Sequence, residues 1–337
     1  MPPTETRAAA GARWAVERMN SVSAAHPRWD EDAVVVAVRR YFTGLGIAPP
    51  EWIHVAESPD QARAMRRPHG NVDNDRYVAR VKQRFDAERD LLGAPARAAI
   101  TEQLDLLADN ALYIALASAV RDQPWPTDDL LGAHTDVAGA ICARAADMSP
   151  ELLWVWDQIL IAFENGLGWY SFVDNGGLIL LPQPAMVIPD QRLHRIDGPA
   201  VIWPDGSGDF FLDGVALDAG LHHRIVHRSM TAENALAVSD PDQRLLAIGA
   251  APADDVLTLL RAQHIDTGLK GTRLYRVRDH FEPEREDFCI TMVDPSTGRT
   301  YLEWVDPEIA EHGDAELCQA RLFGVHLDDW LALRVEA

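Results

Sequence analysis

His194 has the neighbours that best suit chemistry. It stands three positions before Asp197 and between two arginines, Arg192 and Arg195. A carboxylate hydrogen-bonded to an imidazole orients the ring for acid–base catalysis, and a nearby guanidinium can hold an anionic substrate. The same residues also suit a structural role, in which His194 bridges strand backbone and Asp197 caps the turn at Gly198. The pattern makes His194 and Asp197 catalytic candidates and the two arginines candidate ligand contacts, and it favours the structural role.

Aromatic side chains lie close to this segment in the sequence. Trp169 and Tyr170 precede it, and Trp203 and the acidic residue Asp205 follow it. A tryptophan-lined cleft beside histidine and arginine would hold a planar or peptide ligand, so these four residues are candidate ligand contacts. Large aromatic side chains are also the usual filling of a core. Both roles stay open for the aromatic residues, and the core role is favoured.

The acidic segment that follows Trp203 matches part of a calcium-binding pattern. Oxygen-bearing side chains occupy positions 1, 3, 5 and 9 of the loop spacing, at Asp205, Ser207, Asp209 and Asp213. The glycine required at position 6 is replaced by Phe210, and the glutamate required at position 12 by Ala216. The residues that give a calcium loop its sharp turn and its main charge are therefore both missing. A hairpin with acidic residues on its solvent-exposed face explains the same pattern.

Other cofactor and metal patterns are weaker still. His223 and His227 are four residues apart, which on a helix gives half of a zinc site. No H-E-x-x-H or C-x-x-C sequence supplies further ligands, and neither the dinucleotide-binding nor the P-loop glycine pattern occurs. The one serine in a glycine-flanked setting, Ser207, lies in a predicted hairpin loop rather than on a nucleophile elbow. We therefore expect no metal and no cofactor.

The charge of the chain excludes several partners. Its 337 residues include 52 acids and 31 lysines and arginines, which gives a formal charge of −21. Nucleic acids and anionic membranes both attract clustered basic residues, so we expect neither as a partner. The N-terminus lacks the apolar run of a secretory signal, and the most apolar stretch, residues 178–189, is too short for a membrane span. Three separated cysteines in apolar surroundings fit a reducing compartment: Cys142, Cys289 and Cys318. These features predict a soluble cytoplasmic protein.

The elements that must position the candidate residues fall into two parts of the chain, which differ in hydrophobic periodicity. Residues 1–165 have mainly helical periodicity, with predicted helices at 32–42, 78–92, 96–121, 130–148 and 150–165. After Gly166 short β-type runs alternate with proline and glycine. We therefore expect an α+β fold, in which a helical N-terminal half is followed by short antiparallel hairpins interleaved with helices. The boundary between a helical subdomain and an α+β subdomain, 166–337, is placed at about residues 165–175, within one compact unit.

Two hairpins and several helices are predicted in the second half. Residues 198–214 form a hairpin with its turn at 205–208, because glycines that tolerate positive φ separate two β-type runs. A second hairpin pairs 287–293 with 300–305 across the turn sequence DPSTGR, after a lead-in strand at 273–277. Helices are expected at 231–238, 241–248, 252–263, 315–323 and 327–333.

The first hairpin also carries a resemblance to a known family. The phrase RLHRIDGPAVIWPDG, residues 192–206, resembles the hallmark of an uncharacterised bacterial family, a domain of unknown function. Further similarity lies at 42–59, 168–170, 230–248 and 294–307, so that it covers about residues 14–330. Two segments depart from the family's pattern. Leu212-Asp213-Gly214 replaces an aromatic-His-Gly sequence, and Ser239 to Arg244 is a thinner version of its motif. The family has no established activity, so the resemblance implies the extent of the domain and no chemistry.

Two functions from different classes follow from these observations. The favoured one is a cytoplasmic binding or scaffold protein with its interaction surface around the 192–214 hairpin, because no nucleophile–base pair or ligand set stands out. The alternative is an enzyme in which His194 and Asp197 act as an acid–base pair on an anionic or aromatic small molecule or a peptide. The position of the His194 ring relative to the tryptophans distinguishes the two.

Overall fold

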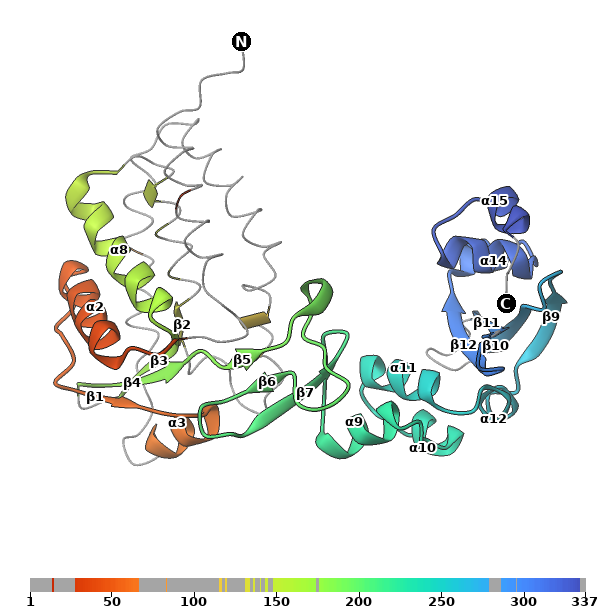
Figure 1. Ribbon diagram of the computed structural model, residues 1–337, viewed down its shortest axis with the longest axis horizontal. Coiled ribbons are helices and arrows are strands. Elements are labelled where there is room, and N and C mark those ends of the chain that lie inside the picture. Colours follow the sequence, from red (N-terminus) through yellow and green to blue (C-terminus); the bar gives the residue numbers. More distant parts are fainter. Residues whose placement is uncertain are drawn as a thin grey trace, which may run out of the picture. The chain divides into compact units, whose positions relative to one another are not determined.

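The computed structural model describes most of the chain outside residues 67–147 (Figure 1). The described ranges are 28–66, 148–173, 176–278, 286–294 and 296–333, with single positions or short runs at 14, 83, 115, 116, 119, 131–133, 136, 140, 143 and 144. The chain divides into two compact units, residues 1–216 and 217–337. Each unit is described by itself.

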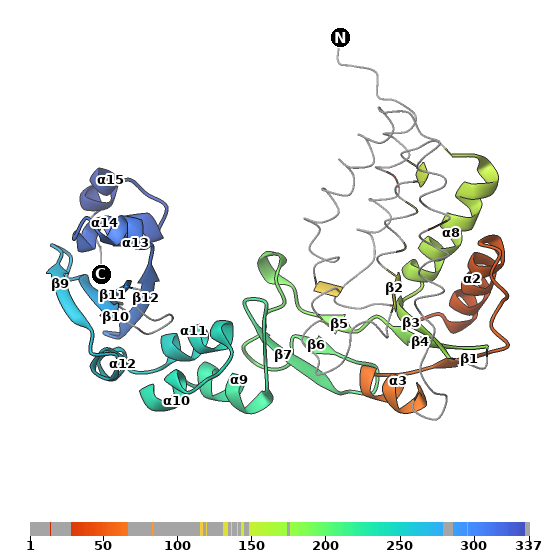
Figure 2. The same cartoon turned by 180° about the vertical axis from the view of Figure 1, so that it is seen from behind.

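Two long helices and a four-stranded sheet build the main core of unit 1. The helices are α2 (Glu31–Gly44) and α8 (Pro150–Glu164), which lie side by side in both Figure 1 and Figure 2. The sheet order is β1-β4-β3-β2, formed by Trp52–Val55, Gly177–Pro182, Leu167–Val173 and Leu131–Gly132. Strand β1 runs parallel to β4, whereas the other two pairings are antiparallel. A short helix, α3 (Pro59–Arg66), follows β1.

Residues at the start of α2 and at both ends of α8 explain where these helices begin or end. Asp30 caps α2 by accepting a hydrogen bond from the N–H of Ala33 at 3.1 Å. Helix α8 begins with Pro150 in its first turn and is followed by Gly166 at φ 97°. A Cβ atom at Gly166 would lie 2.4 Å from the carbonyl oxygen of Arg28, so only glycine allows the chain to pass there into β3.

Aromatic side chains join these helices to the sheet. Phe42 of α2 meets Tyr170 and Phe172 of β3 with ring centroids 5.8 and 5.1 Å apart. Tyr41, on the same helix face, lies 6.0 Å from Trp156 of α8. The helices predicted at 32–42 and 150–165 are therefore confirmed, and both contribute to this core.

A second sheet in unit 1 contains the predicted hairpin. Its order is β5-β6-β7-β8, formed by Ala185–Met186, Val201–Ile202, Gly208–Leu212 and Val215–Leu217, and a 3-10 turn, η3 (Pro189–Gln191), precedes β6. Val201 pairs with Asp209 and Ile202 with Gly208 in antiparallel register. The hairpin prediction for residues 198–214 is therefore confirmed.

Unit 2 combines seven helices with a third sheet in its described residues. Its helices are α9 (Ala219–Val226), α10 (Ala232–Leu236), α11 (Pro241–Ala250), α12 (Ala253–Leu259), α13 (Pro307–Ala310), α14 (Ala315–Leu322) and α15 (Leu327–Ala332). The antiparallel sheet has the order β12-β11-β10-β9, formed by Thr300–Val305, Glu286–Val293, Arg273–Arg278 and Gln263–Thr267. Leu274, Ile290 and Cys318 join the sheet to α14 in a small core.

The α+β class and the second hairpin are as predicted, and some boundaries are not. The predicted helix at 252–263 ends at Leu259, because the following residues turn and enter strand β9. Strand β1 was not predicted, nor was its parallel pairing, and the predicted helix at 130–148 is wrong at Leu131–Gly132, which form strand β2. The change from helical to β-type sequence at Gly166 falls inside unit 1, because β3 and β4 pack with the helices that precede them. The predicted helices at 78–92 and 96–121 lie outside the described residues apart from isolated positions.

Cysteine burial and helix composition agree with parts of the sequence analysis. Cys289 and Cys318 are buried free thiols, and desolvation raises their pKa values to about 12 and about 11. Such thiols are poor nucleophiles. Cys142 lies outside the described residues. Among the helices that the structure describes, none combines the length and the apolar character needed to cross a bilayer.

Candidate functional site

The imidazole of His194 is bound to Asp213, not to Asp197. Its Nδ1 lies 2.8 Å from Asp213 Oδ1 and 3.0 Å from the backbone nitrogen of Asp213. A neutral ring with an unprotonated Nδ1 accepts the backbone N–H, and a protonated ring donates to the carboxylate. The side chain of His194 is 31% exposed, so the ring is open to water on part of its surface. We expected Asp197, three residues along the chain, to orient the ring. Asp213, which follows strand β7, supplies the carboxylate instead.

A tight turn brings Asp213 to the ring. Strand β7 ends at Leu212, and the next two residues, Asp213 and Gly214, take φ values of 50° and 85° before β8 begins. Two successive positive φ values are typical of a type I′ hairpin turn, for which Asp-Gly is a preferred sequence. The backbone N–H of Gly214 also donates to the carbonyl of Leu193 at 2.9 Å. Sequence reasoning missed this contact, although the Asp-Gly pair after a β-type run was the available signal.

Asp197 pairs with Arg195 rather than with the imidazole. Arg195 Nε donates to Asp197 Oδ1 at 2.6 Å, and its Nη1 donates to the carbonyl of Pro199 at 3.4 Å. The hydrogen bond and the positive charge of Arg195 hold the pKa of Asp197 below its ordinary value. Arg195 and Asp197 therefore form hydrogen bonds within their own loop. Arg192 is exposed, and its backbone N–H donates to the carbonyl of Pro189 at 3.0 Å.

The three candidate aromatic residues lie in the core. Trp169 and Tyr170 are 1% exposed and Trp203 is 2% exposed. The rings of Trp169 and Trp203 are 5.6 Å apart, and Trp203 donates its indole N–H to Asp209 at 2.7 Å. The hydroxyl of Tyr170 donates to the carboxylate of Asp136. Because these rings are closed to solvent, they fill the interior and do not line an open cleft around His194.

Asp205 organises the tip of the hairpin. Its Oδ1 accepts hydrogen bonds from the backbone N–H of Ser207 at 2.9 Å and from the Ser207 hydroxyl at 2.6 Å. Partial desolvation would raise the pKa of Asp205, but hydrogen bonds from Ser207 and Ser58 outweigh it and hold the pKa below the ordinary value. The carboxylate therefore stabilises the turn that connects β6 and β7.

One exposed apolar residue stands out in the loop between η3 and β6. The side chain of Ile196 is 62% exposed, and Val187, whose carbonyl accepts the N–H of His194 at 3.2 Å, is 39% exposed. The backbone on the N-terminal side of Ile196 is held by the N–H of Arg195, which donates to the carbonyl of Phe211 at 3.1 Å. The loop therefore presents an apolar side chain on a fixed backbone, a feature that the sequence analysis did not single out.

The structure shows no built metal site in its described part. No group of three or more histidine, cysteine or acidic residues suitable for a metal ion occurs among the described residues. His223 and His227 are neighbours at the end of α9, with ring centroids 4.3 Å apart, as their spacing indicated. Two imidazoles alone are short of the four ligands of a structural zinc site and of the three protein ligands of a catalytic one.

No family model matches the chain, and comparisons with curated proteins and with solved structures found no match. The resemblance to the uncharacterised bacterial family stays a prediction.

Proposed function

We propose that the protein is a binding protein whose contact surface is the Ile196 loop, defined as residues 193–199, together with Val187. The observation that carries the proposal is the 62% exposure of Ile196 on a loop that hydrogen bonds hold on both sides. An apolar side chain presented on a fixed backbone loses little conformational entropy on binding, which makes it suited to act as an anchor for a protein partner.

The polar groups around the Ile196 loop support binding rather than catalysis. Asp197 is paired with Arg195, and the buried tryptophans leave no aromatic wall beside His194. Arg192 and the Arg195–Asp197 pair would form the polar rim that commonly surrounds an apolar anchor. This arrangement offers complementarity to an apolar pocket on a partner, and no nucleophile.

A capture experiment tests the proposal. The wild-type chain, Ile196→Glu and Val36→Glu are immobilised and exposed to a lysate of the source cells, and bound proteins are quantified by mass spectrometry. Val36 is the control, because it is also an exposed aliphatic residue of unit 1, 47% exposed on α2. We expect at least one protein to be retained by wild type and Val36→Glu and to fall at least about tenfold with Ile196→Glu, since burying an unpaired charge opposes binding strongly. Retention that does not depend on Ile196 would contradict the proposal.

Acid–base catalysis by His194 is a second candidate, favoured by its contact with Asp213. A carboxylate on Nδ1 orients the ring and leaves Nε2 for a substrate. His194→Ala separates the roles by melting temperature. If the ring serves mainly as the acceptor for the Asp213 N–H, its loss costs about 0.5–1.5 kcal/mol and lowers the melting temperature by roughly 1–6 °C. A variant with no measurable fall in melting temperature would move the catalytic candidate to first place.

A further inference from the structure

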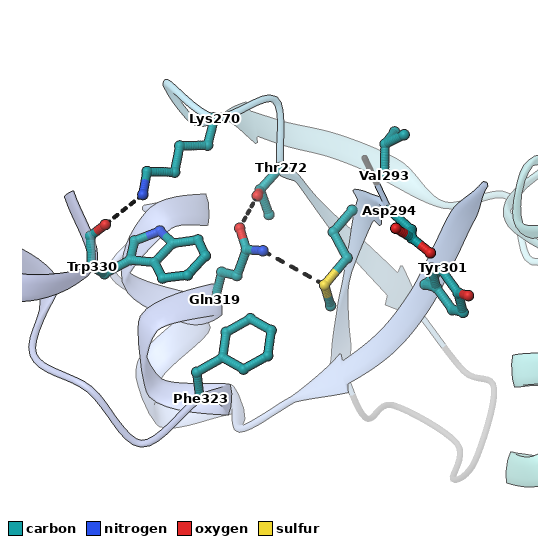
Figure 3. Close-up of a pocket in the computed structure, with 9 residues that line it drawn as sticks. Lys270, Thr272, Val293, Asp294, Tyr301, Gln319, Phe323 and Trp330 are labelled. Atoms are coloured by element: carbon teal, nitrogen blue, oxygen red, sulfur yellow. Dashed lines mark hydrogen bonds between the residues drawn. The ribbon is translucent and has the colours of Figure 1, made fainter. Parts of the chain in front are cut away.

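A pocket of about 660 Å³ lies in unit 2, between the sheet and the helices α14 and α15 (Figure 3). Its volume is in the range of small-molecule sites. Figure 3 shows Gln319 on the same side of the pocket as the rings of Trp330 and Phe323, with Asp294 and Tyr301 across from them. None of these residues belongs to the Ile196 loop, so the pocket is independent of the function proposed above.

A flat aromatic wall forms one side of the pocket. The rings of Phe323 and Trp330 are stacked, with centroids 5.4 Å apart and planes at 19°. Trp330 is fixed because its indole N–H donates to Glu316 Oε2 at 2.6 Å, and the other oxygen of this buried carboxylate accepts the backbone N–H of Lys270 at 2.5 Å. Phe323 is 57% exposed, so this wall has an open apolar ring that a planar ligand could cover.

A buried amide beside that wall lacks a good acceptor. Gln319 is only 7% exposed, and its Oε1 accepts a hydrogen bond from the hydroxyl of Thr272. Its Nε2 lies 3.6 Å from the sulfur of Met292, which is the one acceptor it contacts among the described residues. A thioether sulfur is a weak acceptor, so a buried amide with two N–H groups is poorly satisfied there. A ligand oxygen in the pocket would give this donor a full hydrogen bond.

The two charged side chains that line the pocket have opposite signs. Lys270 Nζ is already used, because it donates to the carbonyls of Trp330 at 2.5 Å and Leu333 at 2.7 Å and lies 4.2 Å from the Trp330 ring centroid. Asp294 stays ionised at neutral pH, because hydrogen bonds from Ser296 and Thr297 hold its pKa below the ordinary value. The partners of Lys270 are neutral carbonyls, so its ammonium keeps its positive charge and offsets the Asp294 carboxylate, and the two lining charges together favour a neutral ligand.

We propose that this pocket binds a neutral, flat, largely apolar small molecule that carries a carbonyl acceptor. The ring of the ligand covers Phe323, and its carbonyl oxygen accepts a hydrogen bond from Gln319 Nε2. The aromatic wall supplies affinity through apolar contact, and the buried amide selects for the acceptor.

Two probes of the same shape test this assignment on the full chain. Acetophenone has a ring and a carbonyl, and α-methylstyrene replaces the carbonyl oxygen with a methylene group. Affinities are measured by titration in 1H–15N NMR spectra, following the tryptophan indole signals. We expect wild type to bind acetophenone about 3- to 10-fold more tightly than α-methylstyrene, although acetophenone is the less hydrophobic of the two.

Three variants identify the source of that preference. In Gln319→Leu the preference for acetophenone should disappear, whereas Thr272→Val disrupts the same Thr272–Gln319 hydrogen bond and should retain it. Phe323→Ala should weaken both probes by a similar factor. Should Gln319→Leu fail to fold, the wild-type preference and the Phe323→Ala result still decide. Equal or weaker binding of acetophenone in wild type, or no binding of either probe, would overturn the proposal.

Discussion

Asp136 shows how burial sets the chemistry of a single residue. Its carboxylate accepts hydrogen bonds from the hydroxyls of Tyr170 and Tyr41. Desolvation nevertheless dominates and raises the pKa of Asp136 from 3.8 to about 7. The sequence suggested Tyr170 as a ligand contact, whereas its hydroxyl donates a hydrogen bond to this partly buried acid. No local pattern could reveal that partner, because the two residues are brought together only by the packing of the core.

The raised pKa predicts a pH dependence of stability. In the folded state Asp136 keeps its proton up to about pH 7, whereas in the unfolded chain it loses the proton near pH 3.8. The stabilisation is therefore fully present below the unfolded pKa and is lost as the pH rises through the folded pKa. Asp136→Asn cannot ionise and keeps a carbonyl acceptor for the tyrosines. Wild type should lose stability as the pH rises from 5.5 to 8.5, whereas Asp136→Asn should not lose this contribution. We therefore expect the free energy of unfolding of Asp136→Asn, minus that of wild type, to be about 2 kcal/mol higher at pH 8.5 than at pH 5.5. Urea unfolding at both pH values checks this, and a constant difference would refute it.

At the scale of elements, turn chemistry carried most of the successful predictions. The hairpin at 198–214 followed from glycine placement, and the second hairpin from the DPSTGR turn, where the Asp294 carboxylate accepts the N–H of Ser296 at 2.8 Å. Strands β1, β2 and β9 were among the elements missed, and β2 lies inside the segment 130–148 that was predicted to be a helix. Strand β1 is only four residues long and pairs with a strand far along the chain, so its conformation depends on tertiary contacts rather than on local pattern.

The turn between β7 and β8 gives a prediction for one glycine. Gly214 has φ 85°, and the atoms nearest to an added Cβ would lie 3.8 Å away or farther, in the side chain of Arg192. The cost of Gly214→Ala therefore comes from backbone strain, about 1–2 kcal/mol, and not from a clash.

Gly249→Ala is the matched control for this change. Gly249 lies in helix α11 with nothing within 4 Å of its added Cβ, so alanine there should be neutral or stabilise by up to about 1 kcal/mol. The melting temperature should therefore fall for Gly214→Ala and stay the same or rise for Gly249→Ala. A Gly214→Ala variant as stable as wild type would show that the turn relaxes at no cost, and that the contact of Asp213 with His194 does not depend on it.

At the scale of the whole molecule, composition and pattern predicted the class of fold but not its division. The chain divides after residue 216, within the last strand of the second sheet, rather than near residue 165, where helical periodicity gives way to β-type runs. A change from helical to β-type periodicity marks where the elements change type. Compact units are instead defined by which elements pack together. Helices α2 and α8 precede this change in the sequence and pack with strands that follow it. The absence of nucleic-acid binding, expected from the formal charge of −21, stays a prediction.

The parallel pairing of β1 with β4 also sets an order of events during synthesis. Trp52 of β1 pairs with Gly177 of β4, so the central strand of the first sheet leaves the ribosome long after its partner. Until then β1 has an unpaired edge, and closing so long a loop is slow. The sheet of unit 2 joins neighbouring strands by short connections and waits for no distant segment. The time taken to synthesise the residues between β1 and β4 therefore governs how long the nascent chain exposes an edge to which other chains can add.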